Sequence, residues 1–143
     1  MKNAHIRVVC LFLLTILLPL HAVDAQNLNS DIYGRWRISS DVTPEGAISS
    51  KTDHEVRAMI GKVADIGSHR FAFNGKTCKK PVYERTIENT LRYFDREWRV
   101  NPTLMPFGDN VTAIDVGCDL YTIYPVDRRR LIIVDDGVFL EAV

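Results

Sequence analysis

Cysteine has the most distinctive chemistry of the residue types in this 143-residue chain, and the first of its three cysteines lies in a segment that we expect to be removed. Lys2 and Arg7 precede an apolar run at 8–20 that contains Cys10, a pattern typical of a secretory signal peptide. The run is shorter than the roughly 20 residues of a membrane-spanning helix. Small residues before Gln26 predict cleavage after Ala25, and an uncleaved anchor is the alternative. The sequence thus predicts a signal peptide at 1–25 and a single domain at 26–143.

Cys78 and Cys118 remain after this removal, and two cysteines in an exported protein predict one disulfide. Closing the loop between them would stabilise the fold by roughly 4 kcal/mol in the chain-entropy model. The alternative is a metal or redox site. It has no support, because there is no Cys-x-x-Cys and neither His54 nor His69 has metal-ligand spacing from a cysteine. We therefore expect a periplasmic or secreted location.

Residues that could perform acid–base catalysis are few. We interpret His54, in the first turn of a predicted helix, and His69, beside a predicted strand, as surface side chains. Asp135 and Asp136 are consecutive carboxylates in a predicted turn, where they would be solvated. The sequence motifs of serine hydrolases, phosphate-binding loops and zinc proteases are absent. The sequence thus predicts a protein that is not an enzyme, with no catalytic, cofactor-binding or metal-ligating residues and no cofactor.

The charges of the chain argue against a nucleic-acid partner. Eighteen Lys and Arg balance eighteen Asp and Glu, and removal of the signal peptide leaves a formal charge of about −1, without the basic excess of nucleic-acid proteins. The densest basic cluster, Arg128 to Arg130, lies between two predicted strands and is interpreted as a solvated turn. We expect no membrane anchor after cleavage of the signal peptide.

Period-two alternation over 32–39 predicts the first strand of the domain. One face of that strand carries Ile32, Gly34, Trp36 and Ile38, and the other carries Tyr33, Arg35, Arg37 and Ser39. We expect Trp36 to fill the core and its flanking arginines to face outward. A capping box at Thr52 and Glu55 predicts a short helix that ends near Gly61.

Two phenylalanines and a turn signal predict a hairpin in the next segment. Phe71 and Phe73 alternate with polar or small residues over 68–74, so we assign both rings to the core. Asn74-Gly75 is a strong hairpin-turn pair, because both residue types tolerate positive φ. A further strand is expected near 82–86.

The segment 87–98 fits a helix, although a strand stays open as the alternative. Its apolar residues fall on one helical stripe, and acid-first pairs at i,i+4 would support a helix. We therefore predict a helix over 87–98 and a core position for Trp98. The stripe consists of Ile87, Leu91, Phe94 and Trp98, and the charge pairs are Glu88 with Arg92 and Asp95 with Arg99.

The C-terminal third shows four β-rich runs separated by turn residues, at 111–116, 120–126, 131–134 and 138–142. This spacing predicts an antiparallel meander. Pairing of the last strand with the first would remove exposed edges and close a barrel. The expected fold is therefore mainly β with minor α: a small antiparallel meander or barrel with one or two short helices.

The sequence resembles two groups of proteins. Tyr33-Gly34-Arg35-Trp36 is similar to the Gly-x-Trp first strand of lipocalins and their calycin relatives. In those families a late arginine packs over the tryptophan, a role that one of Arg128 to Arg130 would take here. Most of the mature chain also resembles small exported proteobacterial proteins of unassigned function, through Gly61-Lys62, Cys78-x-x-Pro81 and Val116-Gly117-Cys118. The resemblance implies a small secreted β-barrel and no particular activity.

These observations favour a secreted or periplasmic binding module without enzymatic activity, such as an inhibitor or an envelope accessory protein. Its expected contact regions are the 41–50 loop, the 107–110 segment and the 128–130 turn. The alternative is a lipocalin-like carrier of a small apolar ligand, and an enzyme with a dispersed site ranks third. The expected partner is thus an unidentified protein or a small apolar ligand.

Overall fold

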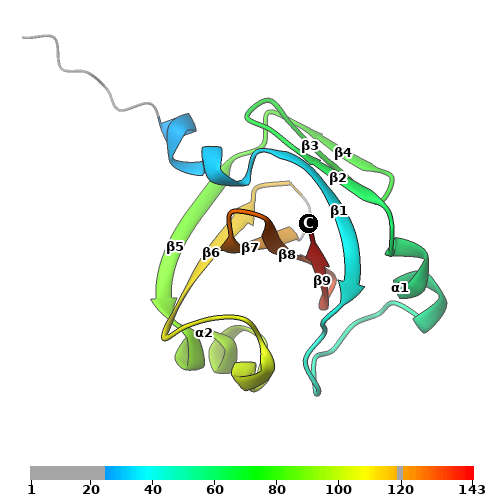
Figure 1. Cartoon of the computed structure of the whole chain (residues 1–143), viewed down its shortest axis with the longest axis vertical. Coiled ribbons are helices and arrows are strands. Elements are labelled where there is room, and N and C mark those ends of the chain that lie inside the picture. Colours follow the sequence, from blue (N-terminus) through cyan, green and yellow to red (C-terminus); the bar gives the residue numbers. More distant parts are fainter. Residues whose placement is uncertain (1–24, 119–120) are drawn as a thin grey trace, which may run out of the picture.

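The structure, a computed structural model, describes residues 25–118 and 121–143, and these residues form one curled antiparallel sheet of nine strands with two short α-helices (Figure 1). The predicted mainly β fold is thereby confirmed. Except for Ala25, the predicted signal peptide lies outside the described residues. None of the helices in these two ranges has the length and apolar content that crossing a bilayer requires.

The elements follow one another in this order: η1 (Ala25–Ile32), β1 (Gly34–Asp41), α1 (Asp53–Met59), β2 (Val63–Ile66), β3 (Arg70–Phe73), β4 (Lys76–Lys79), β5 (Tyr83–Asn89), α2 (Thr90–Glu97), η2 (Pro102–Leu104), β6 (Asn110–Val116), β7 (Tyr121–Asp127), β8 (Arg130–Asp135) and β9 (Val138–Ala142).

The sheet has the strand order β4-β3-β2-β1-β9-β8-β7-β6-β5. The C-terminal meander is confirmed, and so is the pairing of the first strand with the last, since Ile38 lies opposite Ala142. The predicted closed barrel is not formed, because β4 and β5 end the series and do not pair with each other in the described residues. Only residues 80–82 link these two strands. Lys80 has a φ of 55° and Pro81 has no N–H, so the chain turns across the seam instead of forming a hairpin.

A disulfide and a 3-10 segment join the two ends of the open sheet. Cys78 on β4 pairs with Cys118 after β6, with a Cα–Cα distance of 5.9 Å that suits a disulfide, as the sequence predicted. The backbone N–H of Gly117 donates to the carbonyl of Val82 at 2.7 Å. On the same side η1 lies between β5 and β1, and Arg85 donates to the Asn29 side chain at 3.0 Å (Figure 1).

The concave face of the sheet encloses the main hydrophobic core. Trp36 is buried, its indole N–H donates to the carbonyl of Ile32 at 2.8 Å, and its neighbours Arg35 and Arg37 face solvent as predicted. Phe71 and Phe73 are also buried in this core, together with side chains of β6 to β9. A second apolar cluster covers the outer face of β6 to β9 beneath α2, and Trp98 is half-buried at its edge.

Two local predictions for the N-terminal half are confirmed. Thr52 and Glu55 form the capping box of α1, and Gly61 follows the helix with a φ of 85°. Asn74 and Gly75 both have positive φ in the β3–β4 hairpin turn. Strand β2 was not predicted from the sequence, and β4 was implied only as the second strand of the hairpin, since the Lys-rich β4 buries only Cys78.

The prediction of a helix over 87–98 was wrong at its beginning. The chain stays in β5 through Asn89, because all seven residues of that strand pair with β6. The Asn89 side chain then caps α2 by accepting a hydrogen bond from the N–H of Arg92 at 3.1 Å. Ile87 and Leu91 are consequently 70% and 62% exposed, so only half of the predicted stripe faces the core.

A candidate binding groove beside helix α2

A groove of about 570 Å³ lies on the outer face of the sheet. It runs between α2 and the segment that contains Ile48, over strands β5 to β7. Its lining comprises Ile48, Thr86, Glu88, Tyr93, Arg96, Glu97, Trp98, Asp115, Val116, Tyr121, Thr122, Asp136 and Gly137.

The floor of the groove consists of polar side chains at aligned positions of neighbouring strands. Asp115 on β6 lies opposite Thr122 on β7, and the hydroxyl of Thr122 donates to the Asp115 carboxylate at 3.0 Å. Thr86 extends this floor onto β5, since its register partner Ala113 is two residues from Asp115 on the same face. The strands thus hold an exposed carboxylate at the centre of the floor.

Helix α2 forms one wall and fixes its charges in a network. The Arg96 guanidinium donates to both oxygens of Glu88, at 2.8 and 2.9 Å, and to Glu97 at 2.6 Å. It also lies 5.7 Å from the centre of the Tyr93 ring, within the range of a cation–π contact. The hydrogen bonds from Arg96 hold the pKa of the Glu88 carboxyl below its ordinary value.

A chain of hydroxyl and indole groups connects this wall to the sheet. The Trp98 indole N–H donates to the Tyr124 hydroxyl at 2.8 Å, and that hydroxyl lies 3.2 Å from the hydroxyl of Tyr93. Burial raises the pKa of both the Tyr93 and the Tyr124 phenol. Both phenols therefore stay protonated at neutral pH and act as hydrogen-bonding groups.

The opposite wall depends on a close approach between two backbone segments. Gly137 has a φ of 76°, and a Cβ at this position would lie 2.0 Å from the carbonyl oxygen of Ile48. Nearby, the N–H of Phe139 donates to the Thr43 hydroxyl at 2.9 Å. These contacts hold Ile48, which is 88% exposed, at the rim of the groove.

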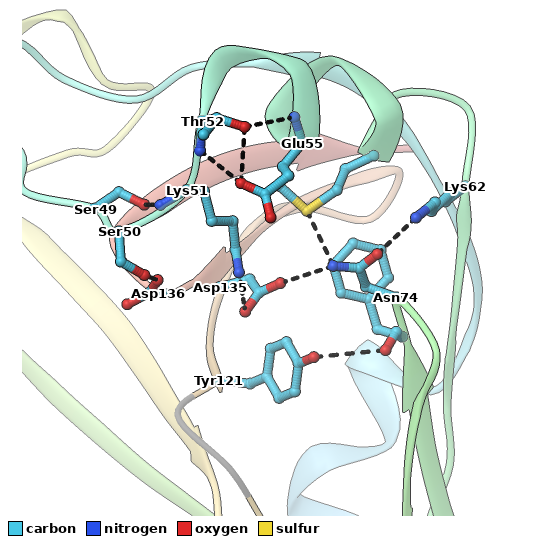
Figure 2. A network of polar contacts seen from close by, with 12 residues as sticks. Ser49, Ser50, Lys51, Thr52, Glu55, Lys62, Asn74, Tyr121, Asp135 and Asp136 are labelled. Atoms are coloured by element: carbon cyan, nitrogen blue, oxygen red, sulfur yellow. Dashed lines mark hydrogen bonds and ion pairs between the residues drawn. The ribbon is translucent and has the colours of Figure 1, made fainter.

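A polar network behind this wall links it to helix α1 and to the β3–β4 hairpin (Figure 2). Asp135 is almost fully buried and forms an ion pair with Lys51 at 3.4 Å. Asn74 at the hairpin turn donates to Asp135 at 3.3 Å and accepts from Lys62 at 2.6 Å. The neighbouring Asp136 accepts a hydrogen bond from Ser50, which lowers the pKa of its carboxyl.

The lining of the groove favours a cationic ligand. In the part of the chain that the structure describes, four carboxylates line the groove, from Glu88, Glu97, Asp115 and Asp136, and one cationic side chain, Arg96, does so. Since Glu88 and Glu97 already bind Arg96 and the buried Tyr93 ring lies beside it, a ligand would meet Asp115 and Asp136 together with the half-buried Trp98 ring. Ammonium and guanidinium groups bind to this combination of carboxylates and rings.

The residues singled out in the sequence mostly lie away from this groove. His54 and His69 are exposed, on α1 and just before β3, in agreement with the surface interpretation. The prediction of a solvated turn was wrong for Asp135, which is the buried last residue of β8 and binds Lys51, whereas Asp136 lies in the turn and binds Ser50. Arg130 forms ion pairs with Asp127 and Glu141. An arginine of 128–130 was expected to pack over Trp36, but the cation–π contacts among the described residues involve Lys76 and Arg96 with tyrosine rings.

Of the three expected contact regions, only the 41–50 loop contributes to the groove, through Ile48. Phe107 is half-buried and stacks on Phe94, with ring centres 5.4 Å apart. Tyr93, Arg96 and Asp115 line the groove, and no role was predicted for them from the sequence. A helical reading of 87–98 that began at Thr90 would have placed Tyr93 and Arg96 on one face, but no signal in the sequence pairs α2 with β6.

Comparison with known proteins gives no relative for this chain, since no family model, curated protein or solved structure matches it. The side chains also suggest no metal centre, because residues 25–118 and 121–143 contain no group of three or more His, Cys, Asp or Glu positioned to hold a metal ion. The functional proposal therefore rests on the geometry of the groove.

Proposed function

We propose that this protein is an exported, non-enzymatic binding module whose groove beside α2 receives a basic segment of a protein partner. The observation that carries the proposal is the lining of the groove, which combines the carboxylates of Asp115 and Asp136 with the half-buried ring of Trp98. Its volume of about 570 Å³ falls in the range of known ligand sites and suits a few side chains of a peptide segment.

The titration behaviour of the groove supports binding over catalysis. Among the groove residues with a shifted pKa, the pKa of the Glu88 and Asp136 carboxyls is lowered and the pKa of the Tyr93 phenol is raised. Each shift moves its group away from neutral pH, whereas a general acid or base works best with a pKa near the operating pH. These three groups are therefore suited to a fixed role in recognition and keep the same charge across neutral pH.

An apolar carrier ranks lower as an alternative, because side chains occupy the concave face where a lipocalin-like ligand would lie. Trp36, Phe71 and Phe73 pack there against β6 to β9. The disulfide between Cys78 and Cys118 supports export to an oxidising compartment, where such a crosslink persists.

The test is capture from an envelope or secreted extract with the mature chain as bait, followed by a binding titration with the purified partner. We expect Asp115→Lys to weaken binding at least about tenfold, because it places a cation on the groove floor. Asp95→Lys is the matched control: it makes the same charge change on an exposed position of α2 that does not line the groove. Its affinity should stay within about twofold of the wild type.

Three results would count against the proposal. A partner that binds the Asp115→Lys variant as tightly as the wild type would place the interface elsewhere. A bait that retains no protein but releases a lipid or other small molecule would favour the carrier. Turnover of a substrate by the purified chain would favour the enzyme.

A further inference from the structure

The second polar surface of the molecule is the outer face of β1 to β4, which lies on the other side of the molecule from α2 (Figure 1). Residues 62–80, which contain β2 to β4, include five Lys or Arg and one acidic residue, Asp65. We call the outer face of these four strands the basic face; its cationic side chains on the strands are Arg35, Arg37, Arg70 and Lys79.

The sheet register places these cations on a single face. Arg35 pairs with Asp65, Asp65 with Ala72, and Ala72 with Thr77 across the four strands, so these residues point to the same side. Arg70 pairs with Lys79 at the next position on that side. All four cations are exposed, whereas the alternate residues Trp36, Phe71 and Cys78 fill the core.

The basic face is also hollowed. A depression of about 330 Å³ is lined by Arg35, Asp65, Arg70, Asn74 and Lys76, among others. Asp65 lies 3.8 Å from Arg70 in an exposed pair, so the strand positions named on this face carry four cations and one carboxylate. Guanidinium groups at such a site bind the oxygens of a phosphate by charge-assisted hydrogen bonds.

The shape and composition of the face select among anionic partners. Its cations extend over four strands, a width of roughly 14 Å at the usual strand spacing, which suits an extended array of charges. The strand positions between them carry Val63, Ala72 and Thr77. Stacking of nucleic-acid bases uses aromatic platforms, which these side chains do not supply. They are also too small to insert into a bilayer, so attraction to a surface would be electrostatic.

We propose that the basic face docks the protein onto a membrane surface that carries anionic phosphate headgroups. Several lysines and arginines near such a surface bind it through its negative potential, and this attraction decays within a Debye length. The docked molecule would direct α2 and its groove away from the membrane. This inference uses none of the groove residues and stands or falls independently of the proposed function.

The test is sedimentation of the mature, disulfide-bonded chain with vesicles of equal parts phosphatidylglycerol and phosphatidylcholine. The variant Arg35→Gln/Arg70→Gln/Lys79→Gln removes three cations from the face. Since each cation near an anionic surface contributes about fivefold, we expect its partition onto vesicles to fall on the order of 100-fold. Wild-type binding should be lost between about 50 mM and 500 mM salt and absent from pure phosphatidylcholine.

The matched control is Arg92→Gln/Arg99→Gln/Arg128→Gln, which makes the same change in net charge at exposed positions outside the basic face. This control should bind within about twofold of the wild type. Equal losses in both triple variants would mean that net charge alone drives binding and would overturn the proposal. Binding to heparin without binding to anionic vesicles would assign the face to a polyanion instead and would also overturn it.

Circular dichroism and urea unfolding of both triple variants test whether the fold is intact. We expect it to be, because the three substituted side chains of the basic face are exposed. Failure of vesicle binding leaves the groove proposal untouched, since Asp115→Lys and its partner titration are measured in solution without lipid.

Discussion

The groove and the basic face belong to the same sheet, yet they are assembled in different ways. The basic face occupies four strands that lie side by side at one end of the sheet, and its cations come from three of them, β1, β3 and β4. The groove combines β5, α2, β6, β7 and two distant turns, and Ile48 meets Gly137 across 89 positions of sequence. Packing of a helix and two turns on the sheet therefore forms the groove, whereas pairing of adjacent strands alone forms the basic face.

Removal of the disulfide should have the largest effect, and it should affect the two regions to different extents. We expect Cys78→Ser/Cys118→Ser to lower the free energy of unfolding by about 4 kcal/mol, because the unfolded chain gains the freedom of the opened loop. Urea unfolding of the non-reduced proteins measures this loss. Hydrogen exchange should increase most in β4, the edge strand of the basic face, and less in β8 at the centre of the sheet. An equal increase in exchange across the whole sheet would show that the disulfide does not stabilise one region more than the other.

Gly137→Ala should damage the groove wall specifically. The new methyl would lie 2.0 Å from the Ile48 carbonyl oxygen at a φ of 76°, so we expect a loss of roughly 3 kcal/mol in unfolding free energy. Gly46→Ala is the matched control, because Gly46 has a φ of 88° but open space around its Cβ position. Its cost should be about 1 kcal/mol, from backbone strain alone. Equal losses in the two variants would disprove the steric role of Ile48.

Tyr124→Phe tests the hydrogen-bonded chain beneath α2. The substitution leaves the Trp98 indole N–H without its acceptor, so unfolding free energy should fall by about 1 to 2 kcal/mol. Tyr93→Phe keeps that acceptor and should cost less. Urea unfolding ranks the two variants, and the NMR shift of the Trp98 indole proton should move in the first variant more than in the second. The reverse ranking would place the essential hydroxyl at Tyr93.

The smallest expected effect concerns the pH dependence of the helix wall. The pKa of Glu88 in the folded protein lies below its ordinary value of 4.5, mainly because of the hydrogen bonds from Arg96. The pair therefore stabilises the fold above that ordinary value, and this contribution is lost as pH falls through the lowered pKa. Arg96→Gln should raise the pKa of Glu88 toward 4.5 in an NMR titration. An unchanged pKa would mean that the ion pair does not form in solution.

Several features of the fold could be read from single short stretches. Thr52 and Glu55 predict their helix because a capping box needs only residues three apart. Asn74 and Gly75 predict their turn because both accept positive φ. The alternation around Trp36 predicts a strand with one buried face, which the structure confirms over Gly34–Asp41, although Ile32 ends the 3-10 segment before it. In each case the deciding interaction lies within one element or one turn.

The candidate site could be predicted only in part, because its residues meet across the fold. Ile87 and Leu91 fit a helical stripe, but pairing of β5 with β6 keeps the first in a strand and leaves both exposed. Glu88 was expected to pair with Arg92 and instead binds Arg96, once the helix begins at Thr90. Asp115 carries no mark of a binding role until β5 and α2 lie beside it.

The charges of the molecule show what the sequence decides and what the tertiary structure decides. The composition alone gives equal numbers of acidic and basic residues, and thus a formal net charge of zero at pH 7. The densest basic run, Arg128 to Arg130, is partly neutralised by Asp127 and Glu141, whereas the separated Arg35, Arg70 and Lys79 gather on one face. The sequence by itself determined the total charge, the turns and the caps, because these depend on residue type and near neighbours. Only the tertiary structure separated basic face from acidic groove, because strand register decides which distant side chains share a surface.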